Sequence, residues 1–303
     1  LFEYPIQSEQ SNFSINPTLA RLGLRTVTVL RFVLPDDTIR AFEYRGNPGL
    51  VRLDPRWHQA ALRFVNLGFE HILDGIDHLL FLACLVIPFR RVRPLIAIIT
   101  SFTVAHSVTL IASAFGFAPD ALWFPALVET AIAMSIVYMA LENVFGVRLQ
   151  RRWLLTFGFG LVHGFGFSFA LRETLQFAGG HLLTSLLAFN LGVELGQLLV
   201  IILLVPLLSL LFRVTAAERA GTILLSVLVA HTAWHWMSER GSELMQYQIQ
   251  FGLPVFDLAL LASAMRWGML VLIIVLLLWL MSLVFPSLDQ TTKPVPADAK
   301  QIK

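Results

Sequence analysis

Apolar stretches of roughly 20 residues follow one another along most of the chain, separated by short polar segments. Each is long enough to cross a hydrocarbon core of about 30 Å as a helix, at about 1.5 Å per residue. We therefore predict an all-α polytopic membrane protein, a bundle of about seven transmembrane helices. The predicted spans are residues 67–88, 94–115, 122–143, 152–171, 182–204, 219–238 and 262–285.

The N-terminal part of the chain has a different pattern. Residues 25–34 alternate between apolar and polar side chains for much of their length, and residues 41–44 form a second such run, as half-buried strands do. We predict a small β-rich segment over residues 1–60, the end of a longer domain. The transmembrane domain then covers residues 61–286, and a flexible tail covers residues 287–303.

Composition supports a membrane protein and excludes other classes. The chain is 56% hydrophobic and 14% charged, with a mean hydropathy of +0.72, far from the values of a soluble domain. The net charge is only +2, and the basic residues form short clusters, so nothing supports nucleic-acid binding. The single cysteine, Cys84, excludes a disulfide framework, and any metal site must use nitrogen and oxygen ligands.

The basic residues also predict an orientation, because positive charge is retained on the cytoplasmic side. They gather after alternate spans and at the end of the chain. We therefore predict a bacterial-type inner-membrane protein with the N-terminal segment outside and the C-terminus in the cytoplasm. The residues that set this orientation are Arg90, Arg91, Arg93, Arg148, Arg151, Arg152, Arg213, Arg219, Lys293, Lys300 and Lys303.

About ten ionisable residues lie inside the predicted spans, although each costs roughly 2.5–3.5 kcal/mol at mid-bilayer. At about 100° per residue, those of the first span share about a third of the helix circumference. On this continuous helix, His71 and His78 fall on nearly one line. The first-span group is Glu70, His71, Asp74, Asp77 and His78.

The later spans add further polar residues at a similar depth. In the predicted orientation most lie in the outer half of the bilayer, and Glu194 approaches the midplane. His231 and His235 are four residues apart, the spacing that lets two imidazoles of one helix reach one ion. We infer one cluster that opens toward the outside. The added residues are His106, Glu129, His163, Asn190, Glu194, Gln197, His231 and His235.

Imidazole and carboxylate ligands together suit divalent Ni, Zn, Co, Cu or Fe, and ligand type alone does not choose among them. We therefore predict a metal site built from His71, Asp74, Asp77, His78, His106, Glu129, His163, Glu194, His231 and His235. Other interpretations stay open. The first-span group could form a buried ion-pair network, and His106 or His163 could bond a backbone carbonyl. Glu129 and Glu194 could join two helices by hydrogen bonds, and the His231 and His235 pair could be interfacial.

Two motifs resemble those of the HupE/UreJ family of nickel or cobalt permeases and accessory proteins of hydrogenase and urease. His71, Asp77 and His78 match its His-x5-Asp-His signature, and residues 162–166, with His163, partly match its histidine-glycine motif. Residues 165–168 replace a second His-Gly pair and a glutamate. The chain resembles the family branch with an extra N-terminal domain. The resemblance implies first-contact ligands at His71, Asp77 and His78, with His106, Glu129, His163 and Glu194 as further steps.

Three functions compete at this point. The first is a permease or metal-handling protein for a divalent transition metal, with Ni, Co or Zn expected. The second is an intramembrane zinc hydrolase with a lipid-like substrate, similar to alkaline ceramidases and adiponectin-type receptors in its late His-x3-His pair, His231 and His235. The third is a structural or assembly subunit. The expected partners are membrane lipids, the metal ion, and other membrane subunits or metalloenzyme maturation proteins.

Overall fold

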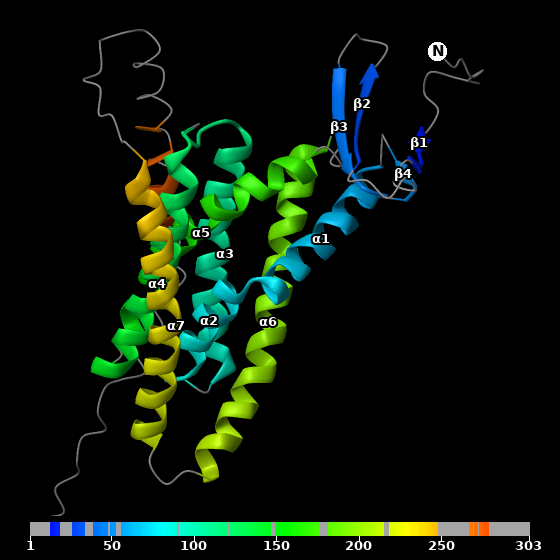
Figure 1. Cartoon of the computed structure of the whole chain (residues 1–303). Coiled ribbons are helices and arrows are strands. Elements are labelled where there is room, and N and C mark those ends of the chain that lie inside the picture. Colours follow the sequence, from blue (N-terminus) through cyan, green and yellow to red (C-terminus); the bar gives the residue numbers. More distant parts are fainter. Residues whose placement is uncertain are drawn as a thin grey trace, which may run out of the picture.

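In the computed structural model, helices α1 to α7 of the described residues form a bundle beside two small β-sheets (Figure 1). Helix α1 leads from the sheets into the bundle and crosses the long helix α6. The structure describes residues 13–18, 26–33, 39–47, 49–52, 56–89, 91–119, 121–146, 149–175, 181–214, 218–247, 267–268, 270–271 and 273–278.

Four strands lie in the N-terminal segment. Strands β2 (Val27–Val33) and β3 (Ile39–Arg45) pair antiparallel, with Val27 opposite Arg45, and β1 (Ser14–Ile15) pairs with β4 (Val51–Arg52). Exposure alternates along β2, as its sequence pattern predicts. A small apolar core of Phe42, Tyr44 and Val51, packed by Phe13, Ile15, Leu30 and Phe32, lies on one side of the strands. The location of this segment outside the membrane stays a prediction.

Three described helices are long and apolar enough to cross a membrane: α3 (Val92–Ala114), α4 (Trp123–Phe145) and Leu182–Arg213 of α6 (Leu182–Val214). They coincide with the predicted spans 94–115, 122–143 and 182–204. Helices α5 (Leu149–Leu175) and α7 (Glu218–Gln246) cover the predicted spans 152–171 and 219–238, whose crossing of the membrane stays a prediction. Most of the predicted span 262–285 lies outside the described residues.

The prediction of one continuous helix over residues 67–88 is wrong. The chain forms α1 (Trp57–Asp74) and α2 (Ile76–Val86), and Gly75 between them has an extended backbone, with φ −77° and ψ 95°. A Cβ atom at this position would lie 2.7 Å from the carbonyl oxygen of His71 and 2.9 Å from Nδ1 of His78. The break therefore needs a residue without a side chain, and it lies between the two histidines of the first motif.

Glycines let the helices of the bundle approach one another closely. Gly192 of α6 lies against the backbone of Val65 on α1, and Gly160 and Gly164 of α5 lie against the backbone of α3 at Phe102 and His106. Such small residues let backbones of membrane helices pack closely. Between these two helix pairs, His71 near the end of α1 lies 6.3 Å from His106 of α3, measured between ring centroids.

Replacement of Gly192 by valine should destabilise the α1–α6 contact. The new Cβ atom would overlap the carbonyl oxygen of Val65, which belongs to a rigid helix backbone. We expect a loss of about 1–3 kcal/mol, the usual range for overpacking, measured as a lower midpoint of thermal unfolding in detergent. Gly158→Ala is the matched control, because no atom lies within 4 Å of its added Cβ. Equal midpoints for the two variants would contradict this account of the contact.

Candidate metal centre

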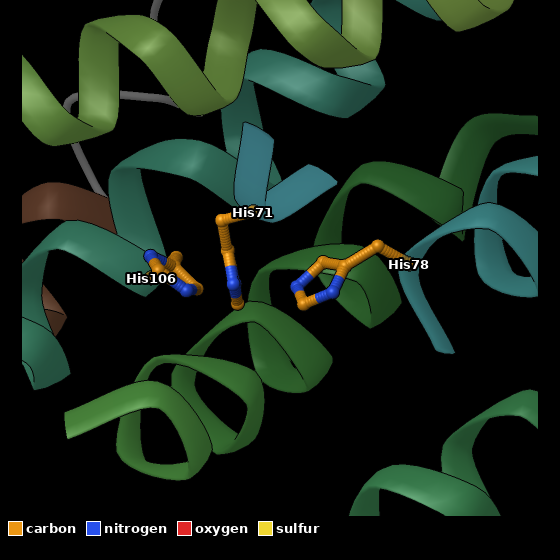
Figure 2. A group of neighbouring side chains, drawn as sticks. All are labelled: His71, His78 and His106. Carbon is orange, nitrogen blue, oxygen red and sulfur yellow. The ribbon is translucent and has the colours of Figure 1, made fainter. Parts of the chain in front are cut away.

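Four helices bring their histidines to one place. His71 from the end of α1, His78 from the start of α2 and His106 from α3 face one another in Figure 2, and their ligand atoms lie within 4.8 Å of each other. His163 from α5 forms a second group with His78 and Asp77 under the same limit. We call these five residues the histidine cluster. His78 belongs to both groups and joins them.

The helix break explains the short distances in this cluster. On a continuous helix, His71 and His78 would be separated by about 10 Å along the axis, at about 1.5 Å per residue. In the structure their ring centroids are 4.7 Å apart, and the rings of His78 and His163 are 5.2 Å apart. His106 lies 6.3 Å from both His71 and His78. The turn at Gly75 therefore makes two ligands of one sequence motif face each other.

Hydrogen bonds fix which ring nitrogen of His106 carries the proton. The Asn190 amide donates through Nδ2 to the carbonyl oxygen of Leu186 at 2.8 Å, so its Oδ1 faces His106. Nδ1 of His106 is 3.0 Å from this oxygen, which can only accept. His106 therefore donates through Nδ1, and its Nε2 has a free lone pair.

The same reasoning applies to His163, in which the two ring nitrogens exchange roles, and to His78, in which they do not. The Ser135 hydroxyl donates its one hydrogen to the carbonyl oxygen of Ile132 at 2.6 Å, so it accepts from Nε2 of His163 at 3.1 Å. The free lone pair of His163 is then on Nδ1. Nδ1 of His78 lies 3.1 Å from a carboxylate oxygen of Asp77, which leaves its Nε2 free. Such partners on the second nitrogen are typical of metal-binding histidines.

The remaining ring nitrogens have no partner among the described residues. Nε2 of His71, His78 and His106, and Nδ1 of His163, are all buried without a hydrogen bond. A buried polar atom without a partner costs about 1–3 kcal/mol. Three of these four atoms, those of His78, His106 and His163, carry the free lone pairs assigned above. The cluster therefore presents several electron-pair donors to one small volume, an arrangement that a cation would satisfy.

Aromatic side chains surround these nitrogens. Phe167 lies 4.0 Å from His71 between ring centroids and stacks on Phe189 at 4.7 Å. Phe102 lies 5.1 Å from His163, and Phe81 lies 5.3 Å from it. Phe167 lies in residues 165–168, where the sequence departs from the histidine-glycine motif that it otherwise resembles. These rings exclude water from the sides of the cluster, so the histidines keep few competing partners.

Other predicted site residues lie elsewhere. Asp74 is exposed on α1, and Glu129 on α4 forms an ion pair with Arg240 of α7 at 3.2 Å. His231 and His235 are exposed on α7, with their rings 4.6 Å apart. None of these residues joins a potential metal-binding group within the described part of the chain.

Glu194 has partners of its own. Its carboxylate is bonded by the hydroxyls of Thr100, at 2.7 Å, and Thr103, so it ties α6 to α3. Ser135 was absent from the predicted site, and no pattern in the sequence of α4 indicated its contact with His163. The Gly75 break could have been recognised, because an isolated glycine inside an apolar helical pattern lowers the helix prediction.

Comparison with known proteins places these observations in context. The sequence profile described as HupE / UreJ protein matches residues 50–240, which contain α1 to α6 and most of α7. No curated protein and no solved structure matches the chain. All five residues of the histidine cluster lie inside the matched region.

Proposed function

Since the chain belongs to the HupE/UreJ family, whose members are related to nickel and cobalt handling, we propose that it is a permease for a divalent transition metal. The metal binds at the histidine cluster as cargo. Nickel or cobalt is the expected ion, because the family suggests them and imidazole ligands suit both. The protein lies in a bacterial-type inner membrane, with its N-terminal segment outside.

One observation carries this proposal. Histidine ring nitrogens from four helices are buried without partners, and for His78, His106 and His163 the opposite ring nitrogen is held by a hydrogen bond. A network that served only to join helices would use both nitrogens of each ring. A metal site uses one nitrogen for the ion and the other for orientation. The cluster follows the second pattern.

The donor set and its dimensions suit a transition metal. Bound imidazole nitrogens lie about 2.0–2.1 Å from the ion, so neighbouring ligands are about 3.3 Å apart in a tetrahedral site. In each of the two groups of three residues the ligand atoms lie within 4.8 Å of each other and need only a modest approach. Asp77 contributes the negative charge and also orients His78. The phenylalanines around the site favour exchange of the ion's water shell for protein ligands.

The broken first helix favours transport over a fixed structural site. Discontinuous helices supply binding sites at mid-membrane depth in many secondary transporters, because their free ends line the path. Here the break at Gly75 lies between His71 and His78. The inner side of such a path would need further polar groups, and Glu194 with its threonine partners supplies the nearest ones on α3 and α6.

X-ray absorption of the detergent-purified protein loaded with Ni²⁺ or Co²⁺ tests the proposal. We expect about one bound ion per chain, with the ring signature of several imidazole ligands. A variant with both His231→Ala and His235→Ala should give the same spectrum, because this exposed pair lies outside the cluster. A spectrum with water ligands only, or one lost in this variant, would refute the assignment. Ion uptake into proteoliposomes then separates transport from lipid hydrolysis.

A further inference from the structure

Three free nitrogens of the histidine cluster are of the same kind. Nε2 of His71, His78 and His106 is in each case buried without a hydrogen bond to a described residue. The ligand atoms of these three residues lie within 4.8 Å of one another, and their rings face one another in Figure 2. Asp77 and Asn190 hold the opposite nitrogens of His78 and His106. We call His71, His78 and His106 the three-imidazole group, which offers three neutral donors to one ion.

Phenylalanine rings, which offer no lone pair to a metal ion, lie against this group. Phe102 lies 6.0 Å from His106 between ring centroids. Phe189 lies 5.6 Å from His71 and 6.5 Å from His106. Both phenylalanines are buried. The sides of the group that face the interior of the bundle are therefore apolar.

Phe167 of α5 lies on the remaining side. Its ring centroid is 4.0 Å from that of His71. Phe167 and His71 are only partly buried, whereas His78 and His106 are buried. Asp77 is also partly exposed, but it bonds Nδ1 of His78, the nitrogen opposite the free one. Phe167 therefore lies on the side from which water can reach the free nitrogens.

We propose that Phe167 is a specificity-determining residue of the metal site. Its ring limits an ion on the three-imidazole group to one further ligand, so that the ion is four-coordinate. The site then favours ions that accept a tetrahedral arrangement, Co²⁺ and Zn²⁺, over Ni²⁺, which prefers square-planar or octahedral sites. This inference rests on the function proposed above and narrows its expected ions.

The number of available ligands supplies the physical reason. An octahedral ion on three imidazoles needs three further donors. No other His, Cys, Asp or Glu of the described residues joins the three-imidazole group within the same limit, so these donors would be waters. A buried water needs two to four polar partners, and a phenylalanine ring supplies none. The apolar sides of the group therefore disfavour three bound waters more than one.

Visible absorption of the full-length protein loaded with Co²⁺ in detergent tests the geometry. A tetrahedral Co²⁺ site has no inversion centre, so it absorbs more strongly than an octahedral one and at longer wavelengths. We expect strong bands for the wild type. Phe167→Ala should replace them by the weak bands of an octahedral ion, because waters enter the space that the ring occupied.

Competition between Co²⁺ and Ni²⁺ tests the specificity in the same samples. The usual order of affinities places Ni²⁺ above Co²⁺. The wild type should bind Co²⁺ at least as tightly as Ni²⁺. Phe167→Ala should shift the ratio of the two dissociation constants toward Ni²⁺ by about 10-fold, the lower end of effects from residues outside the ligands.

Two further variants make the comparison specific. Phe165→Ala is the matched control, since it removes the same ring from the same helix, where that ring lies 5.6 Å from Phe124 between centroids. It should keep the strong bands. Phe167→Gln keeps most of the side-chain volume and gives water a hydrogen-bond partner. It should lose the bands as Phe167→Ala does, and it takes the place of that variant if the alanine protein does not fold.

Each outcome decides a different part of the inference. Octahedral bands in the wild type, or tighter binding of Ni²⁺ than of Co²⁺, overturn the inference and leave the proposed function standing. Strong bands in a folded Phe167 variant, or their loss from Phe165→Ala as well, overturn the role of Phe167. A wild-type protein that binds neither ion overturns the proposed function and the inference together.

Discussion

Replacement of His78 by alanine should lower the metal affinity by more than about 100-fold, because even partners one shell outside the ligands are worth about 10–100-fold. His78 is the ligand shared by both groups of the cluster, so its loss leaves His71 with His106 on one side and Asp77 with His163 on the other. Asp77 also loses its hydrogen-bond partner. Isothermal titration with Ni²⁺ in detergent measures the change.

The control for His78→Ala is His235→Ala, which removes an exposed imidazole from α7. It should leave the affinity unchanged within about twofold, since surface changes away from special features have effects within about 0.5 kcal/mol. Circular dichroism and the elution volume of each variant show whether the fold is kept. Equal affinities for wild type and a folded His78→Ala variant would rule out the histidine cluster as the binding site.

Replacement of Arg152 by methionine should destabilise the protein by about 3–5 kcal/mol, the usual cost of removing one partner of a buried ion pair. Arg152 on α5 is fully buried and lies 3.0 Å from Glu142 of α4. It also bonds Asn143 and the carbonyl oxygen of Cys84, at 3.2 Å, close to the end of α2. Its loss removes the partner of Glu142 and of Oδ1 of Asn143, whereas the Cys84 carbonyl keeps the Asn143 amide as a donor. The free energy of unfolding in detergent measures the effect.

A second variant separates charge from packing at this position. In Arg152→Met with Glu142→Gln the unpaired carboxylate is removed as well, so we expect part of the stability to return. Replacement of whole buried ion pairs is often close to neutral. Glu129→Gln is a suitable comparison, because its partner Arg240 is 44% exposed and such pairs contribute about 0–1 kcal/mol. Equal losses at both pairs would mean that burial of Arg152 is unimportant.

Apolar length predicted well the helices that are long and apolar enough to cross a membrane, where these helices are continuous. Residues 94–115, 122–143 and 182–204 lie within or overlap α3, α4 and α6 almost completely. The first span failed, because hydropathy sums over a window and does not register a single residue with an extended backbone. Gly75 carries no hydropathy signal, yet its conformation decides which histidines meet.

The candidate site was predictable in part. Because an ionisable group inside a bilayer is costly, such residues were expected to have either a function or a partner. Five of the ten predicted site residues meet in the histidine cluster. The rule does not say which of these two roles applies. Glu129 forms an ion pair with Arg240, and Arg240 lies beyond the end of the predicted span 219–238. Ser135 was missed, because a serine in an apolar helix adds little to the free energy of insertion into the bilayer. It therefore gave no signal of a function or a partner.

The break at Gly75 also divides the ligands of the first motif between two helices that pack on different neighbours. His71 moves with α1, which lies along α6, whereas His78 moves with α2, which contacts α4 as well as α6. The angle between α1 and α2 therefore sets the distance between His71 and His78. A rotation of α1 against α2 would move His71 away from Asp77 and His78. We therefore expect release of the proposed ion to depend on the angle between α1 and α2, and the residence time of the metal measures how stiff this joint is.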